Sequence, residues 1–277
     1  MENKKTANIY LFSAAGALLL SLILRTVNFF TSFDSITGYY KFGAALPVIS
    51  NWILAASVVF LLVFSILKFR KKSFDISSGA SKIQYIAAAL ASVASVALAA
   101  SDLSHAINTS NRFFILSFTL SIMTALYFAT VTVELKSVYK VITGLFAAIR
   151  ITILIITCFS DFSVAVNTPD RVIYALAAAS VLIFIASELK LIAGNVRSWL
   201  YIFSAGAATV LCSVSAIPSI IAFHAGLLPK ENSFCAEYYL MLGIAVYSAV
   251  RLINTVYRAK ADNTEKTEPE ESAASEE

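Results

Sequence analysis

Three arginines interrupt long apolar stretches of this sequence: Arg25, Arg150 and Arg251. A charged side chain at the centre of a membrane-spanning helix costs about 2.5–3.5 kcal/mol on insertion scales. Hydrogen-bond acceptors of neighbouring helices, water in a cavity or a bound anion have to offset that cost. These arginines are therefore the residues around which a functional site would be built.

Arg150 lies at the centre of an apolar segment over about 141–160, and Thr157 lies two turns further along the same helical face. No acidic residue is predicted at the depth of Arg150, because the Asp residues fall at or beyond the ends of the apolar segments. The sequence allows two interpretations of Arg150, a polar contact between helices or a contact with an anionic or amphipathic ligand. In the second interpretation the ligand-binding residues are Arg150, Arg25, Asn28 and Thr157.

Arg25 extends a stripe of small residues along the first apolar segment. It lies four residues after Ser21, and Asn28 follows three residues later. Residues at these spacings lie on one side of a helix, so Arg25 is expected to face protein rather than lipid. Its predicted partners are the acidic residues expected near the same membrane face: Asp34, Asp102 and Asp161.

Arg251 repeats the spacing of the first segment, with Asn254 three residues later. We interpret Arg251 and Asn254 as structural polar links between helices. Glu134 and Glu188 are their predicted partners, because both acidic residues end apolar segments on the same side of the membrane.

Catalytic signatures are absent from the sequence. Its two histidines, His105 and His224, are not at metal-ligand spacing, and no Gly-x-Ser-x-Gly or phosphate-binding glycine motif occurs. The sequence therefore predicts no catalytic residue, no metal site and no cofactor. An enzyme acting on lipid-phase substrates is the least favoured functional class.

The composition is that of a membrane protein. The chain has 277 residues, of which 58% are hydrophobic and only 14% charged, and its mean hydropathy is +0.78. The apolar residues form blocks of about 20, the length of helix that crosses the hydrocarbon core. We predict an all-α, polytopic helical bundle with eight spans near 9–30, 47–67, 82–101, 113–135, 141–160, 172–188, 198–222 and 238–257.

The basic residues predict how the chain is threaded, because Lys and Arg are enriched in cytoplasmic loops. With both termini in the cytoplasm, most Lys and Arg residues outside the spans lie on the cytoplasmic side. An even number of spans also places both termini on one side. The strongest basic cluster follows the second span: Lys68, Arg70, Lys71, Lys72 and Lys82.

The predicted domains are a transmembrane domain over 1–258 and an acidic cytoplasmic tail over 259–277. The tail contains no large apolar residue after Tyr257 and is predicted to be disordered. The expected partners are the lipid bilayer, a small molecule in the ligand-binding interpretation, and a protein that docks on the tail. Nucleic acid is not expected, because the positive charge follows the membrane topology.

Similar sequence features recur along the chain. Asp34 and Asp102 follow outward-running spans 68 residues apart, and Lys68 and Lys136 follow the returning spans at the same interval. This spacing suggests four tandem helical hairpins. Small residues four apart on the first, third and seventh spans predict close helix packing there.

The segment from Thr31 to Lys41 contains an Asp-x-x-Thr-Gly turn, formed by Asp34, Thr37 and Gly38. It resembles the first outer loop of an uncharacterised family of multi-pass membrane proteins from Gram-positive anaerobic bacteria. The resemblance implies a bacterial plasma membrane and brings no known activity. The turn itself predicts a loop that folds back over the outer face of the bundle.

Two functional hypotheses follow from the sequence. In the first, the protein binds or transports a small anionic or amphipathic solute within the helical bundle, using Arg150 and Arg25. In the second, it is a non-transporting sensor or assembly module whose arginines are structural. The first predicts a polar cavity shared by Arg150 and Arg25, whereas the second predicts that each arginine is capped by protein groups.

Overall fold

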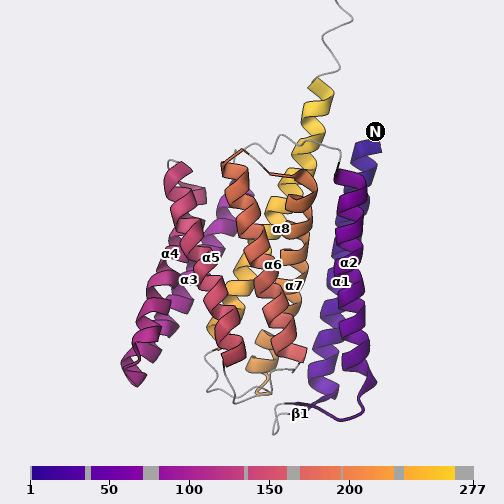
Figure 1. Cartoon of the computed structure of the whole chain (residues 1–277). Helices are drawn as coiled ribbons and strands as arrows, with labels where there is room; N and C mark the ends of the chain where they lie inside the picture. Colours follow the sequence, from indigo (N-terminus) through magenta and orange to yellow (C-terminus); the bar gives the residue numbers. More distant parts are fainter. Residues whose placement is uncertain are drawn as a thin grey trace, which may run out of the picture.

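The computed structural model describes residues 2–34, 39–70, 81–133, 137–160, 169–194, 196–227 and 234–265. These residues contain eight helices that are long and apolar enough to cross a membrane, which confirms the predicted helical membrane bundle (Figure 1). The helices are α1 (Glu2–Thr31), α2 (Ala45–Phe69), α3 (Lys82–Thr109), α4 (Arg112–Thr132), α5 (Ser137–Ser160), α6 (Pro169–Ile192), α7 (Ser198–His224) and α8 (Phe234–Glu265).

Several helices extend beyond the predicted spans. The third helix was expected to end at residue 101, but α3 continues to Thr109. It stops where Ser110 adopts a left-handed backbone, with φ at 52°, and where the Asn111 side chain accepts a hydrogen bond from the Phe113 amide. Helix α3 therefore ends at these polar residues, about two helical turns beyond the end predicted from hydropathy.

The last helix also runs past its predicted end. Helix α8 continues to Glu265, so residues 259–265 of the predicted disordered tail are helical. Residues 266–277, which make up the rest of that tail, lie outside the described residues. The start of α1 and the end of α8 lie at the same end of the bundle, as an even number of spans requires (Figure 1).

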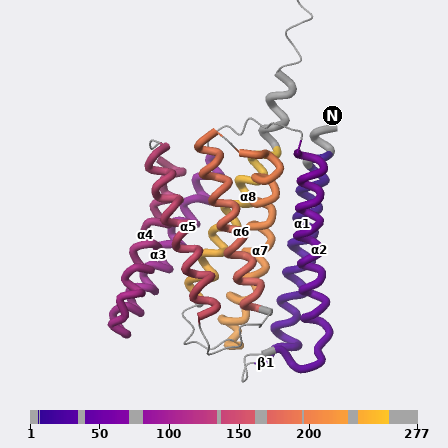
Figure 2. Tube along the Cα trace, in the orientation of Figure 1, coloured from indigo at the N-terminus to yellow at the C-terminus, as the bar shows by residue number. Residues whose placement is uncertain are grey.

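Helices α3 to α8 form a closed series of neighbours, in which each helix packs on the next and α8 packs back on α3. The α1–α2 hairpin stands beside this series and packs mainly on α7 (Figure 2). Helix α7 is the most deeply buried of the eight, because it contacts α6, α8 and both helices of the hairpin.

The small-residue faces lie in the protein interior, where they allow helices to approach closely. On α3 the predicted residues Ala87, Ala91, Ser95 and Ala99 are all buried. On α7 so are Ser204, Ala208, Cys212 and Ala216. On α1 Ser21 is buried, whereas Ser13 and Ala17, which precede it at the same spacing of four, are half-buried.

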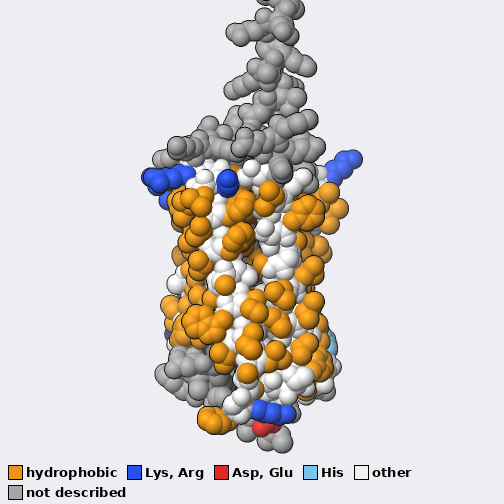
Figure 3. All heavy atoms as spheres, turned by 90° about the vertical axis from the view of Figure 1, so that its right-hand side faces the viewer, with side chains coloured by type: hydrophobic (Ala, Val, Ile, Leu, Met, Phe, Trp, Pro, Cys, Tyr) orange, Lys and Arg blue, Asp and Glu red, His pale blue; other side chains and the backbone are white. Residues whose placement is uncertain are grey.

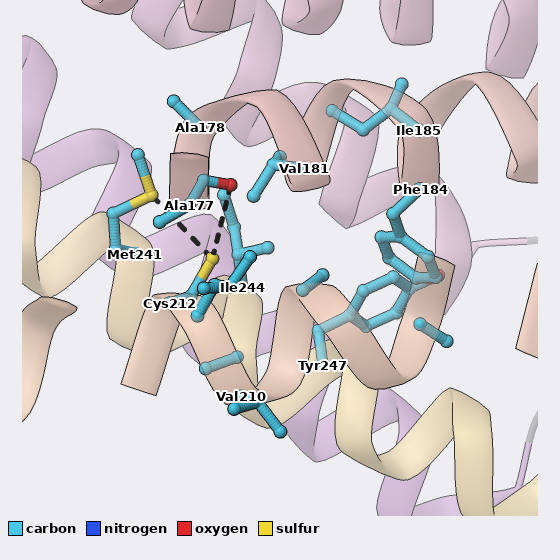
Figure 4. Close-up of a cluster of buried hydrophobic side chains, with 14 of the residues drawn as sticks. Ala177, Ala178, Val181, Phe184, Ile185, Val210, Cys212, Met241, Ile244 and Tyr247 are labelled. Atoms are coloured by element: carbon cyan, nitrogen blue, oxygen red, sulfur yellow. Dashed lines mark hydrogen bonds between the residues drawn. The ribbon is translucent and has the colours of Figure 1, made fainter. Parts of the chain in front are cut away.

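The interior between α6, α7 and α8 is apolar and densely packed (Figure 4). The Cys212 thiol lies 3.9 Å from both the Ala177 carbonyl oxygen and the Met241 sulfur. The Phe184 and Tyr247 rings lie in edge contact, with centroids 6.0 Å apart. This core fixes the three helices against one another around the polar groups described below.

The outer surface of the helices carries exposed apolar side chains. On the α1–α2 side these side chains cover the middle of the molecule, and Lys and Arg lie toward its two ends (Figure 3). On helix α2, Val59, Phe60 and Val63 are exposed, whereas Leu54 and Leu61 are buried in the protein. The surface is that of a protein surrounded by the hydrocarbon of a bilayer.

A short antiparallel hairpin follows α1. Strands β1 (Phe33–Asp34) and β2 (Tyr39–Tyr40) pair Phe33 with Tyr40 and Asp34 with Tyr39. Phe29, Phe33 and Ala222 form a buried cluster against which Tyr40 packs, so the loop folds over the end of α7. Residues 35–38, which include the predicted Thr-Gly turn, lie outside the described residues.

The contact between α3 and α8 depends on Gly243. A Cβ atom at Gly243 would lie 2.9 Å from the Ala91 Cα, closer than packed atoms approach, whereas one at Gly16 would meet nothing within 4 Å. We expect Gly243→Ala to lower the free energy of unfolding by about 1–3 kcal/mol, because the two backbones have to separate. Gly16→Ala is the matched control and should leave the melting temperature in detergent unchanged or higher, since Ala favours helix. Equal melting temperatures for the two variants would contradict this packing.

Candidate functional site

Each of the three intramembrane arginines forms an ion pair with an acidic side chain of another helix. Arg25 pairs with Asp170, Arg150 with Asp102 and Arg251 with Glu188. The pairs lie at different depths, from the end of the bundle that carries the β hairpin to the end that carries the chain termini. Together they contain four of the eight predicted site residues: Arg25, Arg150, Arg251 and Glu188.

Arg150 belongs to a hydrogen-bonded triad built from α3, α4 and α5. Its Nη2 donates to Asp102 Oδ2 at 3.0 Å and to Oδ1 at 3.3 Å, and its Nε donates to the Ser121 hydroxyl at 2.8 Å. The Ser121 hydroxyl donates in turn to Asp102 Oδ2 at 2.8 Å. All three side chains are buried.

The prediction that no acidic residue lies at the depth of Arg150 is wrong. It rested on a third span ending before Asp102, whereas α3 continues for two further turns and carries Asp102 inside the bundle. The helix can hold a carboxylate there because Arg150 compensates the charge. Two apolar helices thus place opposite charges at the same depth. The hydropathy of each helix taken alone does not predict this pairing.

A second carboxylate lies close to this triad. The Tyr174 hydroxyl of α6 donates to Glu237 Oε2 of α8 at 2.8 Å, and Glu237 interacts electrostatically with Arg150 and Asp102. The Arg150 guanidinium therefore attracts the Glu237 carboxyl group, and its ion pair is with Asp102. Hydropathy alone does not predict that these residues come together. The available signal is that Asp102 and Glu237 each lie one residue outside a predicted span.

Arg251 forms a bidentate pair with Glu188. Its Nε donates to Oε1 at 2.8 Å and its Nη2 to Oε2 at 3.0 Å. The Tyr201 and Tyr247 hydroxyls also donate to this carboxylate, and the guanidinium lies 5.8 Å from the centroid of the Tyr201 ring. The structure thus joins Arg251 and Glu188 as expected from the sequence.

The other two residues predicted as polar links behave differently. The Asn254 amide donates to Ser81 Oγ at 2.9 Å and to Gln84 Oε1 at 3.3 Å, so it ties α8 to the beginning of α3. Glu134 lies outside the described residues.

Arg25 pairs with Asp170, at the beginning of α6, which was not among its predicted partners. Asp102 is already bound to Arg150, and Asp161 lies outside the described residues. The Tyr40 hydroxyl also donates to Asp170, at 3.3 Å. Burial raises the pKa of Tyr40 above its ordinary value, and the neighbouring Asp170 carboxylate raises that pKa further, so Tyr40 stays protonated as a donor.

The polar face of α1 is incompletely satisfied. Ser21 Oγ, Arg25 Nε and both polar atoms of the Asn28 side chain are buried without a hydrogen-bond partner among the described residues. Each such atom costs about 1–3 kcal/mol if it stays unpaired. Sites of this kind hold internal water in membrane and soluble proteins alike.

The predicted ligand-binding residues do not form one group. The Thr157 hydroxyl donates to the carbonyl oxygens of Ile153 and Leu154 in its own helix, at 3.0 and 3.1 Å. Arg150 and Arg25 belong to separate hydrogen-bonded groups on different helices. Among the described residues, these hydrogen bonds therefore do not join the set proposed from the sequence into one group.

Two of the three ion pairs follow one pattern. Arg150–Asp102 connects α5 to α3, and the intervening α4 supplies Ser121. Arg251–Glu188 connects α8 to α6, and the intervening α7 supplies Tyr201. Each of these pairs locks three consecutive helices, so their geometry is that of clamps within the bundle.

These features define an integral, multi-pass membrane protein with internal ion pairs. No protein-family model matches the chain, and no curated protein or solved structure is significantly similar to it. Within the described ranges, no group of three or more His, Cys, Asp or Glu side chains is arranged to hold a metal ion.

The Arg251–Glu188 pair predicts a specific pattern of stability. Glu188→Leu leaves a buried guanidinium without its carboxylate and should lower the free energy of unfolding by about 3–5 kcal/mol. Adding Arg251→Met removes the unpaired charge and should restore most of that loss. Melting temperatures in detergent measure both effects, with Lys190→Met, which removes an exposed charge nearby, as the control. A double variant as unstable as Glu188→Leu would show that the pair is not the source of the effect.

Proposed function

We propose that this protein is a non-transporting membrane module, a sensor or assembly partner in a bacterial plasma membrane, whose intramembrane arginines hold the helices together. The observation that carries the proposal is that all three arginines are matched by carboxylates of other helices. An arginine that serves an anionic substrate would instead present free donors to a cavity.

The energetics of the Arg150 triad support this proposal. An anionic solute would have to displace Asp102 from Arg150, and separating a buried ion pair costs about 3–5 kcal/mol. The displaced carboxylate would also approach Glu237, which carries like charge when ionised. A ligand gains little from a site whose charge is already neutralised.

Binding or transport of a small anionic or amphipathic solute is the second candidate, and one observation favours it. Buried polar atoms of Ser21, Arg25 and Asn28 on α1 have no partner among the described residues. A small polar solute that entered between α1 and α7 would satisfy them. This candidate therefore depends on Arg25 and Asn28 more than on Arg150 and Thr157.

The proposed orientation has both termini in the cytoplasm. It is supported by the distribution of Lys and Arg in the sequence, which favours that side. In this orientation the acidic residues after 265 face the cytoplasm, where a protein partner of the module would dock. The bacterial plasma membrane is part of the same proposal and rests on the sequence resemblance.

A double variant tests the role of Arg150. Arg150→Met alone should be strongly destabilised, whereas Arg150→Met combined with Asp102→Leu should melt within a few degrees of the wild type, because both charges are removed together. Inorganic phosphate, glutamate and lysophosphatidic acid are added separately to each purified protein, and melting temperatures are compared. None of these anions should stabilise the wild type more than the double variant.

One result of this experiment would contradict the proposal. Stabilisation of the wild type by one of these anions, lost in the double variant, would favour ligand binding at Arg150. Lys68→Met removes an exposed charge and controls for weak binding of anions to the protein surface. Asn28→Leu then distinguishes binding at α1 from binding at Arg150, since only a ligand at α1 would lose affinity in that variant.

A further inference from the structure

Glu237 has no ion pair among the described residues, although it lies in a membrane-spanning helix. The described spans contain four acidic residues, Asp102, Asp170, Glu188 and Glu237. The first three each pair with one of the three intramembrane arginines. Glu237 is therefore one carboxyl group in excess of the guanidinium groups inside the bundle.

The surroundings of Glu237 are polar. It lies in the first turn of α8, which begins at the end of the bundle that carries the β hairpin (Figure 1). The Tyr174 hydroxyl of α6 donates to its Oε2 at 2.8 Å. The other ionisable groups that interact with it electrostatically are Arg150 of α5, Asp102 of α3 and Tyr238 of α8. Arg150 is the cation of this group, and its Nη2 is already hydrogen-bonded to Asp102.

Opposing effects act on the charge of Glu237. Its partial burial and the like charge of Asp102 favour the neutral acid, whereas Arg150, the Tyr174 hydroxyl and the amides of the first turn of α8 favour the carboxylate. A carboxyl group balanced in this way can exchange a proton near neutral pH.

The same balance decides how Arg150 is held. With Glu237 neutral, Arg150 has Asp102 as its carboxylate and keeps both hydrogen bonds to it, at 3.0 and 3.3 Å. An ionised Glu237 attracts the same guanidinium and, because like charges repel, disfavours the neighbouring Asp102 carboxylate. The strength of the contact between α3 and α5 therefore depends on one proton.

A proton suits this position better than a metal ion does. Within the described ranges, Glu237 belongs to no group of three or more His, Cys, Asp or Glu side chains arranged to hold a metal ion, whereas a proton needs a single carboxylate oxygen. Glu237 is half-buried, so water at the hairpin end of the bundle can deliver a proton to it and remove it.

We propose that Glu237 is a proton-binding site open to the water at the hairpin end of the bundle, and that loss of its proton weakens the Arg150–Asp102 clamp. The proton passes between a Glu237 carboxylate oxygen and that water. The inference goes beyond the proposed function, since it holds whether the protein is a sensor or an assembly partner.

Infrared difference spectroscopy of the full-length protein in detergent detects the proton directly, because protonated carboxyl groups and carboxylates absorb at different frequencies. Exposed Glu residues lose their protons near pH 4.3, so we expect the wild type to keep a protonated-carboxyl band above about pH 6. Glu237→Gln, which keeps an acceptor for Tyr174, should lack that band.

The proton also predicts how stability changes with pH. The folded protein keeps a proton that the unfolded chain releases near pH 4.3, so the contribution of Glu237 to stability falls as the pH rises, until the folded protein releases the proton too. Relative to Glu237→Gln at each pH, the wild-type melting temperature should fall by about 3–5 °C per pH unit between about pH 5 and about pH 6.5.

The two histidines provide the matched controls, because histidine titrates in the same range of pH. His105 interacts electrostatically with Asp102, and His224 is exposed at the end of α7. The fall in melting temperature relative to Glu237→Gln should persist when either histidine is replaced by glutamine.

Hydrogen–deuterium exchange tests the effect on the clamp. At a pH where the infrared band of the wild type has disappeared, the amides of α3 around Asp102 should exchange faster in the wild type than in Glu237→Gln at the same pH. Equal exchange would contradict a weakened clamp.

Further results would overturn the proposal. They are a wild type without the band above about pH 6, a band that persists in Glu237→Gln, or a relative melting temperature that does not fall with pH. Sodium in place of choline that stabilises the wild type but not Glu237→Gln would show a metal cation instead of a proton. If Glu237→Gln does not fold, Tyr174→Phe removes a donor to the carboxylate and should raise the pH at which the band disappears by about half to one unit; an unchanged pH would also contradict the proposal.

Discussion

Charge neutrality inside the hydrocarbon region is the constraint on which this structure depends. Three guanidinium groups lie within apolar helices, and each is matched by a carboxylate from a different helix. Lipid provides no hydrophobic drive for helix association, so directional polar contacts and close packing have to supply it. The ion pairs specify which helices lie together, and the small residues of α3 and α7 let those helices approach.

The two clamps divide the series α3 to α8 into two halves of three helices each. Arg150, Ser121 and Asp102 hold α3, α4 and α5, whereas Arg251, Glu188 and Tyr201 hold α6, α7 and α8. The Tyr174–Glu237 hydrogen bond connects α6 to α8 within the second half. Glu237 also interacts electrostatically with Arg150 of the first clamp. Both clamps oppose relative movement of the helices that they join, which supports the proposed module over a transporter that alternates between two states.

The α1–α2 hairpin is attached differently. It packs mainly on α7, and Arg25 ties it to the beginning of α6 through Asp170. Its attachment leaves polar atoms of Ser21, Arg25 and Asn28 on α1 without a hydrogen-bond partner among the described residues.

The sequence by itself determined the class of protein, the eight helices and the residues that carry unfavourable charge, because hydropathy and helix length are local properties. It also predicted the Arg251–Glu188 contact, since both residues lie near the same end of their spans. It did not determine the partner of Arg150 or Arg25. Asp102, Asp170 and Glu237 lie at the edges of apolar segments, where hydropathy places them at the surface. Only the packing of separate helices decides that Asp102 is buried and that Asp170 and Glu237 are half-buried.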